Sequence, residues 1–413
     1  MSRHLTNLFI IALICLALAM LGGLVWANTV YVRAYPIEKD FLVPWLGART
    51  FLQYGDSPYG EPATQRAQIV YYGRLATEDE DPLQLWLPFP VELFYFPFAL
   101  VTDYALARAI WMTCLEIALV ALALLSLRLT GWKPARTLLP LVLLFSLFWV
   151  YGAFSLASGS GIGFLALAMV GLLLALREEH DELAGMLLLL SLSAPRMNGV
   201  FLFFILWWIF YHRRWRVVWG FLMGLLLLLA LSFLFLPDWF LSFLKGLLSY
   251  ISYNPGLSLT SILASWSPVA GPRLGWVISG GLLLVLFVEW GNTLRKDFRQ
   301  FLWTVSLTLA ATPLLGIPML PREYVFLLIP LVLFLSILAE RWSRPRRWGV
   351  AGIVLIVILA GSWLLTLKLS AANAYAALAD SLVLLLPVLL ILGLYWMRWW
   401  FIHPRRTGFE TLP

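Results

Sequence analysis

The chain has 413 residues, of which 62% are hydrophobic and only 12% are charged. This is more apolar surface than a soluble core can absorb, and apolar runs of about 20 residues, the length that crosses a bilayer as a helix, recur almost from end to end. The formal charge of +7 comes from basic residues that lie between these runs, as at 212–216 and 341–347, so the positive-inside rule explains it without a nucleic acid partner. The composition therefore excludes a soluble enzyme and predicts an all-α, polytopic protein of the cell membrane, with the lipid bilayer around it.

The first apolar run, at 8–30, is longer than the roughly 7–15 residues at the core of a cleaved signal peptide. We interpret it as an uncleaved first span whose N-terminus lies in the cytoplasm. Residues 31–85 form the one long polar segment and should then be extracytoplasmic. Within this loop, 41–54 and 62–75 have the patterning of amphipathic helices that lie on the membrane surface.

The rest of the chain is a series of apolar segments. Residues 85–97 contain several prolines and predict a kinked re-entry into the bilayer. Residues 183–211 are interrupted at 193–198, which predicts two half-helices that meet within the membrane, and 239–253 predict another interfacial helix. The remaining spans are expected near 105–129, 137–152, 161–177, 217–236, 274–290, 298–315, 323–340, 348–369 and 376–400. We therefore expect about 11–13 transmembrane helices in one domain, 1–413.

Asp40 is the leading catalytic candidate, because it follows the first span at a point where the chain can fold back onto the membrane surface. A carboxylate there, partly desolvated by Phe41 and Trp45, could remove a proton from a hydroxyl group. The alternative is a solvated loop aspartate beside Lys39.

Arg196 is the second candidate, because it interrupts the apolar segment 183–211. Charged residues within a membrane are costly and are functional by default, and a guanidinium group suits a phosphate or a carboxylate. The alternative is a shorter span from which Arg196 reaches the membrane surface.

Three further charged residues are candidates for substrate contact. Arg322 and Glu323 open an apolar run, although they could equally form a self-paired helix start with Glu323 favoured by the helix dipole. Glu92 lies in the proline-rich re-entry, where acid–base chemistry or a structural hydrogen bond would explain it.

Two other segments are weaker candidates for a functional site. The acidic run 78–81 could bind a divalent cation, but it lacks the spacing of a known cation loop, so a solvated loop is the simpler interpretation. The glycine-rich segment 158–163 does not match a phosphate-binding fingerprint and predicts a tight turn. We find no metal-ligand cluster, hydrolytic triad or nucleotide motif, and expect neither a metal nor an organic cofactor.

A set of short motifs follows in a characteristic order. They are Asp40-Phe41, Ala48, Leu52, Gly55 and Pro58-Tyr59 in the first loop, Pro88-Phe89-Pro90 with Pro97 at the re-entry, Ala184-Gly185 and Ala194-Pro195-Arg196 in mid-chain, and Pro321-Arg322-Glu323-Tyr324 with Pro330 near the end. Taken together, this pattern resembles the GT-C superfamily of membrane glycosyltransferases, and within it glycosyltransferase family 87, whose members resemble polyprenol-phosphate-mannose-dependent mannosyltransferases.

The resemblance implies a GT-C-type helical bundle and a hexosyl transfer, with mannose as the family's usual sugar. The donor would be a polyprenyl-phosphate-sugar and the acceptor a hydroxyl of a lipid or glycan at the outer membrane face. Asp40 would be the general base of an inverting reaction. Arg196, Arg322, Glu323, Tyr59 and Glu92 would contact the substrates.

The sequence departs from the family pattern in mid-chain and near the end. Arg196 stands where the family carries a lysine, and Glu323 stands where it carries a histidine. Two alternatives therefore remain beside the enzyme: a transporter or flippase of a lipid-linked or anionic substrate, and a catalytically inactive protein with the GT-C fold.

Overall fold

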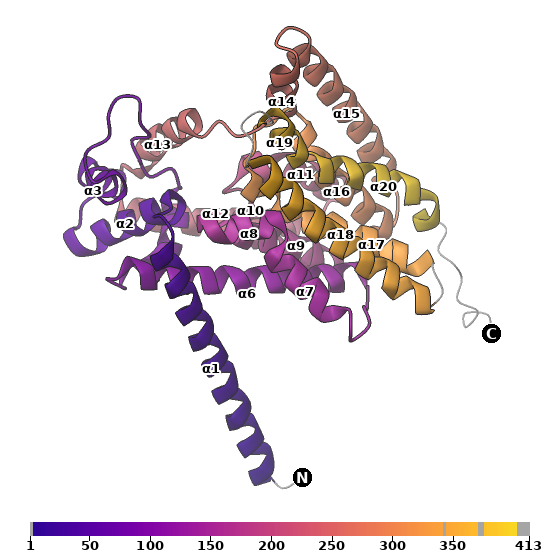
Figure 1. The fold of residues 1–413 in the computed structure, drawn as a ribbon, viewed down its shortest axis with the longest axis horizontal. Coiled ribbons are helices and arrows are strands. Elements are labelled where there is room, and N and C mark those ends of the chain that lie inside the picture. Colours follow the sequence, from indigo (N-terminus) through magenta and orange to yellow (C-terminus); the bar gives the residue numbers. More distant parts are fainter. Residues whose placement is uncertain (1–2, 342–343, 371–375, 403–413) are drawn as a thin grey trace. The chain divides into compact units, whose positions relative to one another are not determined.

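The computed structural model describes residues 3–341, 344–370 and 376–402, and this part of the chain is almost entirely helical (Figure 1). No strand forms within it; a single antiparallel bridge joins Leu257 to Met319. The predicted all-α class is therefore confirmed.

In the described part of the chain, seven helices are long and apolar enough to cross a membrane, so the protein is a multi-pass integral membrane protein. The bent pair formed by α7 (Leu139–Phe148) and α8 (Val150–Ser158) makes an eighth span if it is counted as one, and α9 (Ile162–Arg177) and α11 (Pro195–Tyr211) are shorter apolar helices. The expectation of about 11–13 spans also counted such shorter segments.

Contacts within the chain divide it into two compact units, each assembled from segments that are distant in sequence. The first unit contains residues 1–117, 156–160 and 229–254, and the second contains 118–155, 161–228 and 255–413. The prediction of one domain over 1–413 stays a prediction.

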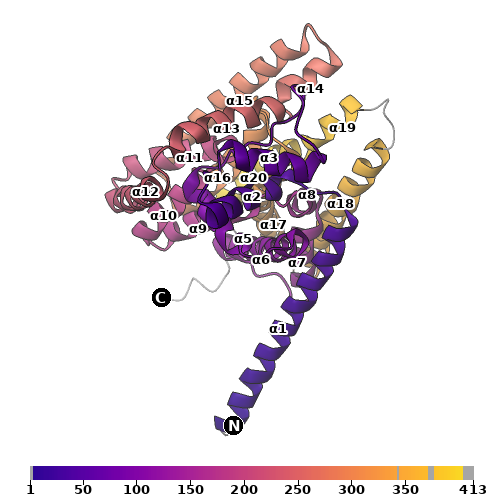
Figure 2. The ribbon, with the colours of Figure 1, turned by 90° about the vertical axis from the view of Figure 1, so that its left-hand side faces the viewer.

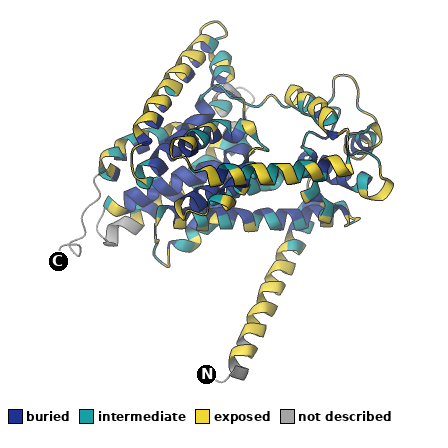
Figure 3. Cartoon of the chain, turned by 180° about the vertical axis from the view of Figure 1, so that it is seen from behind, coloured by how far each residue is buried: buried dark blue, intermediate teal, exposed yellow. Residues whose placement is uncertain are grey.

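The first unit begins with α1 (Arg3–Ala34), which is exposed along most of its length, as expected of a helix that meets lipid rather than protein (Figure 3). The segment that the sequence predicts to be extracytoplasmic then forms α2 (Lys39–Tyr54) and α3 (Glu61–Tyr72), which pack against each other (Figure 2). A helix is therefore present at both predicted positions, and their place on the membrane surface stays a prediction; the residues from Phe41 to Ala48 of α2 are all buried within the protein.

The proline-rich segment forms three short turns: α4 (Phe89–Glu92), η1 (Leu93–Tyr95) and α5 (Phe96–Ala99). Eleven helical residues span only about 17 Å, whereas the hydrocarbon core is about 30 Å thick. The segment is therefore too short to be a transmembrane span by itself, and its re-entry into the bilayer stays a prediction. The prolines, which lack an N–H group, divide it into turns that pack against α2.

The first unit is completed by the start of α6 (Tyr104–Thr130), the end of α12 (Trp215–Phe235) and the whole of α13 (Trp239–Tyr253). The last of these coincides with the interfacial helix predicted at 239–253. It packs against the loop ahead of α4, where Trp86 stacks on Tyr250 with ring centroids 4.4 Å apart.

The second unit contains the rest of the bundle. Its other helices are α10 (Asp181–Ser191), α14 (Leu259–Trp266), α15 (Gly271–Thr293), α16 (Phe298–Ala311), η2 (Thr312–Leu314), η3 (Pro321–Leu327), α17 (Leu328–Arg341), α18 (Arg344–Ser370), α19 (Ala376–Val383) and α20 (Leu385–Ile402). Its core lies around α16, η3 and α17, whose residues are almost all buried.

Candidate functional site

Asp40 lies in the first turn of α2 and is only 4% exposed. The chain is extended at Glu38, the residue before the helix, and becomes helical at Lys39. The first turn of a helix carries unpaired backbone N–H groups and the positive end of the helix dipole, so it is a favourable place for an acidic residue. Asp40 is thus not the solvated loop residue of the alternative interpretation.

The residue after Asp40 anchors this turn in an aromatic cluster. The Phe41 ring is fully buried, with its centroid 6.1 Å from that of Tyr95, 6.0 Å from that of Tyr104 and 5.8 Å from that of Trp111. One turn later, Trp45 donates a hydrogen bond from its indole N–H to the carbonyl oxygen of Phe98. These contacts keep bulk water from the start of α2 and fix its position.

One face of α6 holds the backbone on both sides of this turn. Tyr104, Arg108 and Trp111 lie on that face because they are four and three residues apart. The Tyr104 hydroxyl lies 3.4 Å from the Glu38 carbonyl oxygen, and the Trp111 indole N–H donates to the Gly159 carbonyl oxygen over 2.8 Å.

Arg108 is 1% exposed and donates to two carbonyl oxygens, that of Pro36 over 3.3 Å and that of Ala157 over 2.6 Å. Sequence reasoning missed this residue, although an arginine near the start of a long apolar run was a visible signal.

The glycine-rich turn predicted at 158–163 also reaches this cluster. Gly159 adopts a positive φ of 68°, and a Cβ atom there would lie 3.0 Å from the Cβ of Phe41. The backbone therefore approaches Phe41 more closely than a larger residue would allow without strain. This turn is part of the wall beside Asp40.

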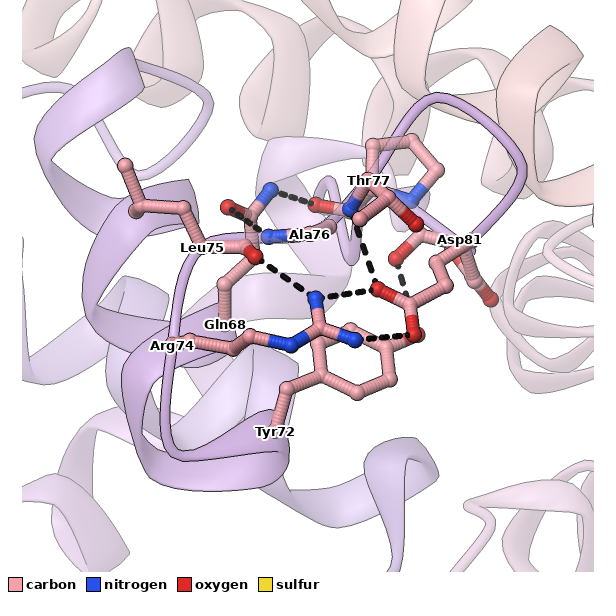
Figure 4. Close-up of polar contacts among 9 residues, drawn as sticks. Gln68, Tyr72, Arg74, Leu75, Ala76, Thr77 and Asp81 are labelled. Atoms are coloured by element: carbon pink, nitrogen blue, oxygen red, sulfur yellow. Dashed lines mark hydrogen bonds and ion pairs between the residues drawn. The ribbon is translucent and has the colours of Figure 1, made fainter.

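The loop after α3 is tied down by its acidic run (Figure 4). Arg74 makes two hydrogen bonds to the Glu80 carboxylate, of 2.7 and 2.8 Å, and this pairing lowers the pKa of Glu80 to about 2. Asp81 accepts a hydrogen bond of 2.6 Å from the ammonium group of Lys39, the residue before Asp40. These carboxylates thus hold the loop to α2 and to its own backbone.

Glu92 lies at the end of α4, completely buried against α2. A Cβ atom on Gly47 would lie 3.0 Å from its Oε1, so the absence of a side chain there makes room for the carboxyl group. Within the described chain neither oxygen makes a well-formed hydrogen bond. Burial raises the pKa of Glu92 well above its usual value, opposed in part by the nearby N–H of Ala48. Burial therefore favours the protonated, neutral form of this group over the carboxylate.

Tyr59 lies beside this buried acid and faces the same loop. Its hydroxyl donates to the Leu87 carbonyl oxygen over 2.6 Å. Burial, and then the charge of Glu92, raise the pKa of Tyr59. Tyr59 and Glu92 thus link α2, the turn before α3 and the proline-rich segment.

Arg196 lies in the second unit, in the first turn of α11. The two half-helices expected here do not continue one span. Arg214, after α11, donates to the Leu176 carbonyl oxygen over 2.8 Å and pairs with Asp181, the first residue of α10. The start of α10 therefore lies beside the end of α11. The two helices form a hairpin whose tip is 192–194. The 11 residues of α10 are about 16 Å long, so Arg196 lies deep along this hairpin.

Arg322 and Glu323 begin η3, also in the second unit. The Leu320 N–H donates to Glu323 Oε2 over 2.9 Å, which caps the helix. Tyr324 is fully buried and stacks on Tyr151 with centroids 5.2 Å apart. The capping bond gives Glu323 a structural role at the start of η3, and its contact with a substrate stays a prediction.

The candidate residues thus form two groups. Asp40, Tyr59 and Glu92 belong to the first unit, and Arg196, Arg322 and Glu323 belong to the second. Among the described residues, no group of three or more His, Cys, Asp or Glu side chains is placed to hold a metal ion.

Comparison with known proteins bears on residues 88–318, which match the family model for glycosyltransferase family 87. No curated protein and no solved structure matches the chain. The match covers the proline-rich segment and all the helices from α6 to η2, among them the hairpin that carries Arg196.

Proposed function

The chain belongs to glycosyltransferase family 87 and is a multi-pass glycosyltransferase of the cell membrane, and from this premise we propose that it moves a hexose from a polyprenyl-phosphate-sugar to a hydroxyl of a lipid or glycan. The sugar we propose is mannose, which follows from the resemblance alone. The reaction takes place at the outer face of the membrane, because the first loop follows a span whose N-terminus we place in the cytoplasm.

The observation that carries the proposal is the burial of Asp40 in the first turn of α2. A carboxylate that is 4% exposed, and whose neighbour in sequence is buried among aromatic rings, is expensive to maintain unless its charge has a use. Such a group is suited to take one proton, that of an acceptor hydroxyl brought against it.

Transfer then proceeds in one displacement. Asp40 takes the acceptor proton as the hydroxyl oxygen bonds to the anomeric carbon, and the bond from that carbon to the phosphate oxygen breaks on the opposite face. The anomeric carbon is inverted through an oxocarbenium-like state, the same charge problem that glycosidases face. The polyprenyl phosphate leaves with the bonding electron pair as an anion.

The developing negative charge on that phosphate requires a cation or hydrogen-bond donors. Arg196 and Arg322 are the candidates for this role in the second unit, because a guanidinium group can donate two parallel hydrogen bonds to a phosphate. Glu323 and Tyr59 would contact sugar or acceptor hydroxyls. Glu92 is completely buried, so it would act on the substrate indirectly, by holding the wall of the site in place.

The test is sugar transfer from polyprenyl-phosphate-mannose to lipid and glycan acceptors by the purified full-length protein. We expect Asp40→Asn to reduce the rate by about 10²- to 10⁴-fold, the usual contribution of a general base. Asp56→Asn, a neutralisation in the same loop, serves as the matched control and should retain activity.

Full activity of the Asp40→Asn protein would remove the proposed base. Movement of the lipid-linked sugar across vesicle membranes without transfer would favour a flippase. A folded protein that neither transfers nor moves the sugar, with several sugars and acceptors tried, would favour the inactive alternative.

A further inference from the structure

A cavity of about 320 Å³ lies in the second unit. None of the residues that line it is among the six candidate site residues named from the sequence. It is formed where α15 ends, α16 begins and α20 ends, and α16 packs against both of the other helices (Figure 1). The side chains that matter here are Glu289, Asn292, Lys296, Gln300, Trp303 and Arg398.

The depth of this cavity follows from the lengths of the helices around it. The candidate spans Gly271–Thr293 and Asp380–Ile402 both end beside the cavity. Glu289 and Asn292 of the first span and Arg398 of the second line its wall. A span ends where the hydrocarbon core gives way to the headgroups. The cavity is therefore at headgroup depth.

Its side of the membrane follows from the basic residues nearby. Arg295, Lys296 and Arg299 lie between α15 and α16, and the arginine-rich segment 341–347 follows α17. Arg299 pairs with Glu340 over 2.8 Å, which places the start of α16 beside the end of α17. An excess of basic residues marks the cytoplasmic side.

The charges within the cavity are only partly paired. Arg398 makes two hydrogen bonds to Glu289, of 2.6 and 2.8 Å, and its guanidinium carbon lies 4.9 Å from the centroid of the Trp303 ring. This pair is neutral as a unit. Within the described chain, the side chains of Lys296, Asn292 and Gln300 make no hydrogen bond or ion pair. One ammonium and two amide groups thus remain as donors.

We propose that this cavity binds the phosphate group of an anionic phospholipid from the cytoplasmic leaflet. Lys296 provides the charge, and the amides of Asn292 and Gln300 donate to phosphate oxygens or to headgroup hydroxyls. The aromatic wall of Trp303 and Phe401 suits the glycerol and the first carbons of the acyl chains. Basic pockets between helices on the cytoplasmic side are suited to anionic headgroups.

This inference does not depend on glycosyl transfer, because the site uses other residues and the test measures binding. Purified full-length protein in detergent is titrated with phosphatidylglycerol, and bound lipid is counted by native mass spectrometry. Phosphatidylcholine and inorganic phosphate are the comparison ligands. Lys296→Gln is the test variant, and Lys133→Gln, an exposed lysine of another loop, is its matched control.

We expect Lys296→Gln to weaken phosphatidylglycerol binding by roughly fivefold to tenfold, the effect of losing one charge near the membrane surface. Lys133→Gln should bind like the wild type, and Gln300→Leu should weaken binding as a second, uncharged variant. Equal binding of phosphatidylcholine, or an unchanged affinity in Lys296→Gln, would overturn the site. Displacement of phosphatidylglycerol by an equal concentration of inorganic phosphate would overturn the lipid as its ligand.

Discussion

Arg108 of α6 donates a hydrogen bond of 2.6 Å to the carbonyl oxygen of Ala157. The same guanidinium group reaches the carbonyl oxygen of Pro36, four residues before Asp40. One buried side chain therefore joins the chain before α2 to the turn that covers Phe41. The position of the proposed base depends on a residue that need not touch a substrate.

We expect Arg108→Met to destabilise the protein by about 1–3 kcal/mol, because the carbonyl groups of Pro36 and Ala157 lose a charged donor. Proposed transfer activity should fall with it, since the start of α2 would no longer be held. The control is Arg33→Met: Arg33 pairs with Asp103 over 3.2 Å, but the two side chains are 66% and 49% exposed. An exposed pair contributes about 1 kcal/mol or less.

The measurement is thermal unfolding in detergent, followed by circular dichroism. Equal losses of stability for the two variants would contradict the role assigned to Arg108.

Glu92 gives a prediction about pH. Because burial raises its pKa in the folded protein, the folded state holds a proton that the unfolded state releases above about pH 4.5. The contribution of Glu92 to the free energy of unfolding is therefore largest below that pH. It falls by about 1.4 kcal/mol per pH unit as the pH rises toward the pKa of Glu92 in the folded protein. Glu92→Gln, which is neutral at every pH, should remove this dependence.

The measurement is the free energy of unfolding of both proteins between pH 5 and pH 8. Glu61→Gln, a change at an exposed residue of α3, should leave the wild-type slope unchanged. If the wild type and Glu92→Gln lose stability in parallel as pH rises, Glu92 is not a neutral acid in the folded protein.

The sequence predicted those features that depend on local patterning. The amphipathic helix at 41–54 differs from α2 by two residues at its start, and the helix at 239–253 matches α13. Both have an apolar face whose spacing is visible within one window of sequence. The apolar runs located most long helices for the same reason.

Features set by distant contacts were missed or misread. The segment 183–211 looks like one interrupted span, and only the pairing of Arg214 with Asp181 shows a hairpin. Arg108 bonds to residues that are 72 and 49 positions away, so nothing near it in sequence indicates its partners. The burial of Phe41, the residue after Asp40, likewise depends on α6 and on the turn at Gly159, which lie far along the chain.

Gly246 gives a prediction about the docking of α13. A Cβ atom at this position would lie 2.0 Å from the backbone oxygen of Leu85, so Gly246→Ala must push the helix away from the loop and weaken the stacking of Trp86 on Tyr250. We expect a loss of about 1–3 kcal/mol, the usual effect of overpacking. Gly280→Ala in α15 meets nothing within 4 Å and should be neutral or stabilising by up to about 1 kcal/mol.

Hydrogen–deuterium exchange of peptides from 83–90 and 239–253 measures this docking directly. Faster exchange in both peptides is expected for Gly246→Ala alone. Unchanged exchange there would show that α13 is not held by its contact with Leu85.

The pair of Glu289 and Arg398 gives a prediction in the second unit. The Glu289 side chain is only 9% exposed, so removing Arg398 takes away the bidentate partner of a largely buried carboxylate. We expect Arg398→Met to cost about 1–3 kcal/mol, less than breaking a fully buried ion pair, because the Arg398 side chain is itself 37% exposed. The double variant Glu289→Leu with Arg398→Met removes both charges and should recover most of that loss. A double variant as unstable as Arg398→Met would mean that packing of the arginine on Trp303, rather than charge, stabilises this end of α20.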